Sequence, residues 1–214
     1  MKSEVLVTGS GGLIGSKFVQ TIGNQYNCTS LEVSHPTHPV DITNYEQLLP
    51  AIQKSAATHL VHFAAYTDVT GAWQQTGDKN GSAYRVNVLG TENVVQACEV
   101  TQKHLIHIST AYVFDGQKEG LYLEDDLMQP IEWYGETKAK AEEVVMKSRI
   151  PWTILRIDQP FRQDPFAKLD IVHAIAHQLQ KHTLPPQFSD HFFGPTIIED
   201  LVRVIVWVLR TNTT

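Results

Sequence analysis

The chain has 214 residues, of which 42% are hydrophobic and 19% charged, with a formal net charge of −6. This balance is typical of one globular domain, or of one domain with a small lobe. The negative charge and the lack of a Lys/Arg run argue against a surface for nucleic acids or anionic membranes. Cys28 and Cys98 are the only cysteines and lie in apolar or helical surroundings, which argues against a disulfide framework.

The apolar runs are short. The first, "EVLVT", passes straight into a glycine turn and is too short for a signal peptide. The late run "LVRVIVWVL" is interrupted by Arg203 and is too short to span a bilayer. We therefore expect a soluble, cytoplasmic protein with no membrane partner.

Short β-branched runs alternate with longer helical stretches up to residue 157. In chain order the pattern predicts a strand at 4–8, a helix at 12–25, a strand at 28–33, a helix at 44–55, a strand at 58–65, a helix at 82–100, a strand at 103–110, a helix at 130–148 and a strand at 151–157. Strands that are apolar throughout belong in a parallel sheet covered on both faces, and the alternation requires right-handed crossovers. The sequence predicts a doubly wound, Rossmann-like α/β sheet.

Two prolines and one glycine should affect the predicted helices. Pro50 should break or kink the helix at 44–55, which Asn44 begins. Gly90 would cost about 1 kcal/mol against alanine inside the helix at 82–100, which indicates close packing there. Pro130 should open the helix at 130–148.

The pattern changes after residue 157. Two stretches rich in Pro, Asp and Phe flank a helical stretch, and "IIEDLVRVIVWVLR" predicts a last helix, with a strand as the alternative. We interpret residues 1–157 as one Rossmann-like domain. Residues 158–214 would form a small lobe over the carboxyl edge of the sheet.

A glycine-rich turn, "TGSGGLIG", lies between the first strand and the first helix. Gly9 would allow the tight turn, Gly12 the approach of a phosphate to helix N-terminal amides, and Gly15 the packing of helix on strand. Glycines at this spacing also occur in turns without a ligand. Their place between a strand and a helix favours a dinucleotide site.

Two acidic residues follow the second strand. Glu32 is placed to accept hydrogen bonds from the adenosine ribose, and it would repel a 2′-phosphate. It therefore favours NAD(H), with NADP(H) as the alternative, unless it is a solvent-exposed glutamate at a strand end. Asp41, in "VDIT", either lies by the adenine or caps a turn.

With "TGSGGLIG", "STAYVFDG" and "YGETK" in this order, the chain resembles the extended short-chain dehydrogenase/reductase superfamily. Within it, the segments "VDIT", "AAYTDV", "NVLGTENVVQAC" and "GPTIIEDL" are most similar to dTDP-4-dehydrorhamnose reductases. The resemblance covers residues 4–157 well and 194–210 thinly. It implies a reductase that uses a nicotinamide cofactor on a keto group, with a nucleotide sugar as the expected substrate and a homodimer as the expected assembly.

The resemblance also implies the site residues. Thr110, Tyr134 and Lys138 correspond to the catalytic threonine, tyrosine and lysine. An unperturbed tyrosine titrates near 10, and a lysine cation on the same helix face should lower its pKa. Thr110 would hold the carbonyl oxygen while Tyr134 gives the proton. The expected cofactor-binding residues are Gly9, Gly12, Leu13, Ile14, Gly15, Glu32, Asp41, Ile42, Ala64, Ala65 and Asn87. Asn87 also corresponds to an asparagine that braces this site in the superfamily.

Each of these residues also has a structural interpretation. Tyr134 and Lys138 could be an exposed pair on a helix, Thr110 could cap a strand, and Asn87 could be a polar residue on a long helix. The chain also departs from the family pattern. Ala111 replaces an aspartate in "STAY", "TGAW" replaces a charged loop at 70–73, and the sequence ends soon after "GPTIIEDL", which predicts a shortened lobe.

Histidines do not predict a metal site. The pairs in "HLVH" and "HLIH" lie at i and i+3 of strands, where side chains face opposite sides. "HAIAH" at 173–177 lacks the glutamate of a zinc protease and is interpreted as a surface pair.

Two alternatives to a reductase stay open. One is an epimerase or dehydratase with a recycled cofactor. The other is a regulatory protein that binds the cofactor without turnover.

Overall fold

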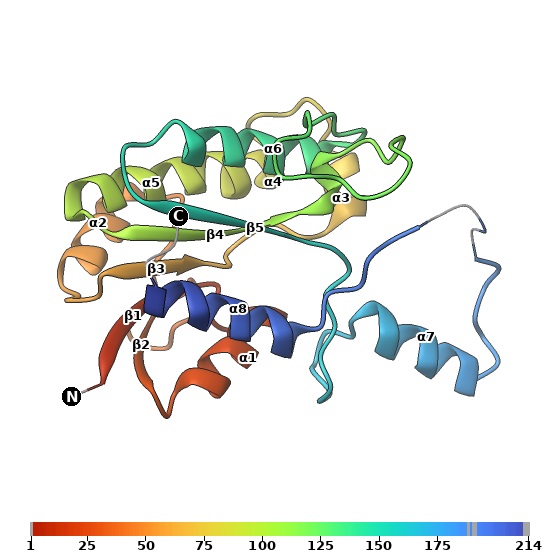
Figure 1. Ribbon diagram of the computed structural model, residues 1–214, viewed down its shortest axis with the longest axis horizontal. Helices are drawn as coiled ribbons and strands as arrows, with labels where there is room; N and C mark the ends of the chain where they lie inside the picture. The colour runs from red at the N-terminus through yellow and green to blue at the C-terminus, as the bar shows by residue number, and fades with distance from the viewer. Residues whose placement is uncertain (1, 188, 190–191, 212–214) are drawn as a thin grey trace.

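The computed structural model describes residues 2–187, 189 and 192–211. Within these residues, five parallel strands form one sheet in the order β2-β1-β3-β4-β5 (Figure 1). They are β1 (Ser3–Thr8), β2 (Tyr26–Leu31), β3 (His59–His62), β4 (His104–Thr110) and β5 (Trp152–Ile157). β2 and β3 lie on opposite sides of β1, so a crevice opens at the carboxyl ends of β1 and β3. The predicted parallel α/β sheet is confirmed.

Helices cover both faces of the sheet (Figure 1). Their bounds are α1 (Leu13–Ile22), α2 (Tyr45–Gln53), α3 (Val69–Trp73), α4 (Ser82–Tyr84), α5 (Gly90–Thr101), α6 (Trp133–Met146), α7 (Ile171–Gln180) and α8 (Ile198–Thr211). A π-helical turn joins α4 to α5, and a short 3-10 turn follows β4. None of the described helices is long and apolar enough to cross a membrane.

Two hydrophobic cores result from the alternation of side chains along the strands. Leu60 of β3 packs on the side of α2, α5 and α6, together with Leu48 and Val94. Val61, the next residue of β3, packs on the side of α1 and α8, together with Phe18. Fully burying such side chains contributes about 1.5–3 kcal/mol each. Both cysteines are free thiols in the described structure, as the sequence predicted.

The long helix predicted at 82–100 is interrupted. Residues Arg85–Leu89 form the π-helical turn, and α5 begins only at Gly90. A Cβ atom at Gly90 would lie 2.7 Å from Cδ1 of Ile42, so this glycine permits the close packing that the sequence indicated. The turn places the buried side chain of Asn87 next to the candidate site.

The expectation that Pro130 opens a helix is wrong. The chain around Pro130 is not helical, and α6 begins three residues later at Trp133. The Glu132 side chain caps α6 by accepting hydrogen bonds from the Tyr134 and Gly135 amides. Pro50 lies inside α2 and does not divide it, although the helix ends three residues further on.

The last helix packs on the sheet. α8 is helical, so the alternative strand is wrong, and its buried residues join the core of α1 and the sheet. Of the described residues between β5 and α8, none belongs to either hydrophobic core. They include α7, which has no buried residue and extends away from the sheet (Figure 1).

Candidate active site

A cavity of about 630 Å³ opens at the carboxyl ends of the strands, a volume typical of small-molecule sites. It is lined by the turn after β1, the ends of β2, β3 and β4, the start of α6, and residues 157–171. Every predicted site residue except Asn87 lines this cavity. The structure therefore brings the glycine turn and the Tyr/Lys pair into one space.

The three glycines of the turn differ in whether the fold leaves room for a side chain. Gly9 has φ +69°, and a Cβ atom there would lie 2.5 Å from the Ala64 amide nitrogen. A Cβ atom at Gly15 would overlap the Gly9 carbonyl oxygen. Both glycines are therefore required by the fold. At Gly12 a Cβ atom would meet only that same oxygen, at 3.3 Å, so the protein itself does not require glycine there.

The beginning of α1 fits an anionic group. Gly12 is the residue before the helix, and no side chain of the described chain caps it. The first-turn residues Leu13 and Ile14 line the cavity. Uncapped amides at a helix N-terminus bind phosphates, so these residues fit the pyrophosphate of a nicotinamide dinucleotide.

Both acidic residues lie on the cavity wall. Glu32 follows β2 directly, and its carboxylate accepts a hydrogen bond of 3.0 Å from the Gly11 amide. Asp41 accepts hydrogen bonds from the amide and hydroxyl of Thr43, both at 2.8 Å. Asp41 therefore fills its predicted turn role while it lines the cavity.

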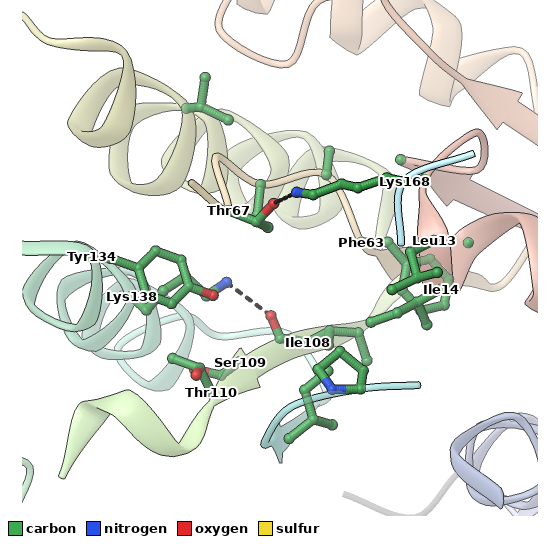
Figure 2. Close-up of a pocket in the computed structure, with 18 of the residues that line it drawn as sticks. Leu13, Ile14, Phe63, Thr67, Ile108, Ser109, Thr110, Tyr134, Lys138 and Lys168 are labelled. Atoms are coloured by element: carbon green, nitrogen blue, oxygen red, sulfur yellow. Dashed lines mark hydrogen bonds between the residues drawn. The ribbon is translucent and has the colours of Figure 1, made fainter. Parts of the chain in front are cut away.

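The three predicted catalytic residues come from two neighbouring elements. Thr110 is the last residue of β4, and its hydroxyl accepts a hydrogen bond of 3.2 Å from the Tyr112 amide. Tyr134 and Lys138 lie one turn apart on α6. In Figure 2 all three side chains lie on the same side of the cavity. The helix pair is thus not an exposed surface pair, because Lys138 is only 2% exposed.

The electrostatics differ from the prediction for the tyrosine. Burial raises the pKa of Tyr134 to about 12, and its hydrogen bond with Thr110 opposes this rise. The Lys138 ammonium donates to the Ile108 carbonyl at 2.8 Å (Figure 2) and to His107 Nε2 at 3.3 Å. Burial lowers the pKa of Lys138 to about 8, opposed by the charge of Glu142. The expected lowering of the tyrosine pKa by lysine is therefore not found here.

Asn87 lies behind the cavity wall. Its side-chain oxygen accepts a hydrogen bond from the Tyr66 amide at 2.8 Å, and its side-chain nitrogen donates to the Tyr66 carbonyl at 3.2 Å and to the Thr137 hydroxyl at 2.9 Å. These bonds join the loop after β3 to α6. The structure therefore gives Asn87 a bracing position, not a place on the cofactor surface.

Several lining residues were not predicted from the sequence. Tyr112 packs edge-on against Tyr134, with ring centroids 5.8 Å apart, and its hydroxyl accepts from Gln159 at 3.3 Å. Lys168 reaches across to the Thr67 hydroxyl at 3.4 Å (Figure 2). Tyr112 could have been found from its place in "STAYV". Lys168 lies in a segment without a motif.

The histidines of β3 and β4 pair across the strands. Within each strand the two side chains diverge, as predicted, but the register brings His59 to His104 and His62 to His107. Their ring centroids are 5.0 and 5.3 Å apart. No group of three or more metal-ligating side chains gathers anywhere in the described residues.

The whole chain, residues 1–214, matches the family described as the RmlD substrate binding domain. The chain belongs to this family. It is 28% identical over 208 residues to dTDP-4-dehydrorhamnose reductase of Aggregatibacter actinomycetemcomitans, which covers 96% of this chain and 67% of that protein. It is 30% identical over 212 residues to dTDP-4-keto-6-deoxy-D-glucose reductase of Streptomyces niveus, covering 98% and 70%. The chain thus spans roughly two thirds of the length of these curated relatives.

Solved structures of a reductase and of an epimerase are similar to this chain. The dTDP-4-dehydrorhamnose reductase of Bacillus anthracis, in complex with NADP, is similar with a TM-score of 0.85 and 26% identity, covering 99% of this chain and 72% of that one. The UDP-glucuronic acid 4-epimerase of Bacillus cereus, in complex with UDP-glucuronic acid and NAD, gives a TM-score of 0.79 and 25% identity, covering 98% and 74%. The resemblance inferred from the motifs is confirmed.

Proposed function

We propose that this chain reduces the keto group of a nucleotide sugar with a nicotinamide cofactor. The proposal rests on one observation: a glycine turn suited to a pyrophosphate lines the same cavity as Thr110, Tyr134 and Lys138. The named activities of the RmlD relatives support the same reaction class.

Thr110, Tyr134 and Lys138 each have a separate role in the proposed reduction. The cofactor, when bound, supplies the hydride. The Thr110 hydroxyl holds the keto oxygen of the sugar. Tyr134 keeps its phenolic proton at neutral pH, since its pKa is about 12, and gives that proton to the oxygen as the carbonyl carbon is reduced. The charge of Lys138 stabilises the phenolate that remains.

The cofactor is proposed to be NADH, with NADPH as the alternative. The Glu32 carboxylate, held beside the glycine turn by the Gly11 amide, would accept hydrogen bonds from ribose hydroxyls and repel a 2′-phosphate. The relatives include structures in complex with NADP and with NAD, so they are compatible with either cofactor.

The proposed setting is a cytoplasmic enzyme that binds no nucleic acid and forms a homodimer. The net charge of −6 supports the second point, the absence of nucleic-acid binding. Light scattering on a size-exclusion column tests the dimer, for which the supporting argument is the superfamily resemblance.

Tyr134→Phe tests the activity. With a dTDP-4-keto-6-deoxy sugar as substrate, we expect NADH oxidation to fall by roughly 10²- to 10⁴-fold, the usual contribution of general acid catalysis. NADH affinity should stay within about twofold, because only a hydroxyl group is removed. Tyr45→Phe, on α2 and outside the cavity, is the matched control. Unchanged turnover in the Tyr134 variant would refute both the reductase and the epimerase.

The structural similarity to a UDP-glucuronic acid 4-epimerase supports a second candidate function, the epimerisation of a nucleotide sugar. An epimerase would convert the nucleotide sugar without net consumption of NADH, whereas a reductase consumes one NADH for each product. NADH binding without conversion of any keto sugar would instead favour a regulatory protein.

A further inference from the structure

His107 is a buried histidine that the proposed mechanism does not use. It lies on β4, three residues before Thr110, and its side chain is fully buried on the face of the sheet covered by α6. Its Nε2 atom lies 3.3 Å from Nζ of Lys138. The carbonyl of the next residue, Ile108, accepts a hydrogen bond of 2.8 Å from the same Nζ atom.

The hydrogen atoms at this point can be assigned. An ammonium group has three N–H donors and no acceptor, so His107 Nε2 must accept. The imidazole is then neutral and carries its hydrogen on Nδ1, which has no partner among the described residues. Burial holds the pKa of His107 well below its usual value, and the charge of Lys138 acts in the same direction.

A second histidine holds the ring of the first in place. His62 packs on His107 with ring centroids 5.3 Å apart. Its Nδ1 atom lies 2.6 Å from the Thr8 hydroxyl, and its Nε2 atom lies 3.2 Å from the Thr91 hydroxyl. Thr91 itself donates to the Asn87 carbonyl at 2.7 Å, so His62 donates from Nε2. Both ring nitrogens of His62 are therefore engaged, and the ring is fixed.

We propose that His107 is a positioning residue for Lys138. Together with the Ile108 carbonyl it takes two of the three ammonium hydrogens, and the third is left for the cavity, where the cofactor and the Tyr134 hydroxyl would lie. Loss of the Nε2 acceptor would free the ammonium group to turn. This inference rests on the proposed function, because it assigns His107 a task in that same site.

The same acceptor also favours the charged lysine. The ionisable groups that face Lys138 are His107 on β4, His62 on β3, and Tyr134 and Glu142 on its own helix. Of these, only His107 accepts a hydrogen bond from Nζ among the described residues. Removing an acceptor of the charged form moves deprotonation to lower pH.

The test compares His107→Gln with His107→Met. Both side chains are unbranched, but only glutamine offers a strong acceptor. NADH affinity is measured from pH 6 to pH 10 by energy transfer from tryptophan to nicotinamide, and kcat/KM is measured over the same range. In the unaltered protein we expect NADH affinity to weaken at high pH as Lys138 loses its proton. This falling part of the pH profile is the alkaline limb. In the Met variant this alkaline limb should move down by about one pH unit or more, with at least a tenfold loss in kcat/KM.

The Gln variant should keep the alkaline limb within about 0.3 pH units of the unaltered protein and recover most of kcat/KM. His104→Met is the matched control, since His104 lies on the same strand, packs on His59 and bonds Thr153 away from the cavity. It should leave the limb unchanged.

Three results would overturn the inference: a Met variant with an unchanged limb, a Gln variant whose limb is displaced, or a limb that moves equally in the His104 control. If the Met variant does not fold, His107→Leu, which also lacks an acceptor, takes its place with the same expected result. If the unaltered protein binds NADH but reduces no keto sugar, the proposed function fails, and the binding limb still tests the role of His107.

Discussion

Glu32 should set the preference between the two nicotinamide cofactors, and Glu32→Gln tests this with little change of shape. The glutamine oxygen can still accept the hydrogen bond from the Gly11 amide, which the carboxylate accepts at 3.0 Å. Only the negative charge is removed. We therefore expect NADPH to bind more tightly to the variant, while NADH loses a little of its hydrogen bonding.

The size of the change follows from Coulomb's law. A carboxylate and a phosphate charge about 4 Å apart repel by about 1 kcal/mol in water and by about 4 kcal/mol at an effective dielectric constant of 20. Glu32 is partly exposed on the cavity wall, which favours the lower part of that range. We expect a gain of about 1–2 kcal/mol for NADPH, or roughly 5- to 30-fold in affinity.

The assay is a titration with each cofactor, read by energy transfer from tryptophan to nicotinamide at two salt concentrations. The gain should shrink at high salt, because screening weakens repulsion between exposed charges. Glu46→Gln, which removes the same charge from α2 outside the cavity, is the control. A preference for NADPH in the unaltered protein, or an unchanged ratio of affinities in the Glu32 variant, would refute the reasoning.

Two further predictions follow from the glycine turn and the buried histidines. Gly12→Ala should weaken NADH binding by about tenfold or more with little change in Tm. Gly15→Ala should lower the free energy of unfolding by about 1–3 kcal/mol, because its Cβ atom would overlap the Gly9 carbonyl oxygen. NADH titration and thermal unfolding of both variants check this, and equal losses of Tm would contradict it. Burial lowers the pKa of His62 to about 3 and that of His104 to about 4, below the unfolded value of 6.5. The unfolded state therefore binds more protons below pH 6.5, and each histidine should remove about 1.4 kcal/mol of stability per pH unit as the pH falls from 6.5 toward its folded pKa. Urea unfolding between pH 7 and pH 5 measures this slope, and a flat profile would show that these histidines can take up protons while folded.

The glycine turn and the Tyr134/Lys138 pair could be predicted from the sequence because each is local. A turn between a strand and a helix has few conformations, and residues four apart on a helix share a face. The interruption of the long helix at Asn87 could not be predicted, since it depends on partners 21 and 50 residues away. Tertiary hydrogen bonds there override local helix propensity.

The pairing of His62 with His107 shows the same limit. Alternation along a strand predicts which face each histidine occupies, and that prediction holds. Which histidine it meets depends on the register between β3 and β4, and a shift of one residue would separate them. Lys168 was missed for a related reason, because only the folded path of residues 158–171 brings it to the cavity.

In the proposed mechanism, Lys138 acts on Tyr134 after the proton transfer and not before it. In the structure its ammonium bonds to β4, and burial keeps the phenol of Tyr134 protonated. A reductase needs that proton at the start, so a pKa of about 12 suits the reduction direction. Once the proton has left, the phenolate is a buried anion, which is costly without a nearby positive charge. In the proposed mechanism, the Lys138 ammonium, bonded to Ile108 and His107 one turn away, would supply that charge without having to move, which is the task proposed for His107 on β4.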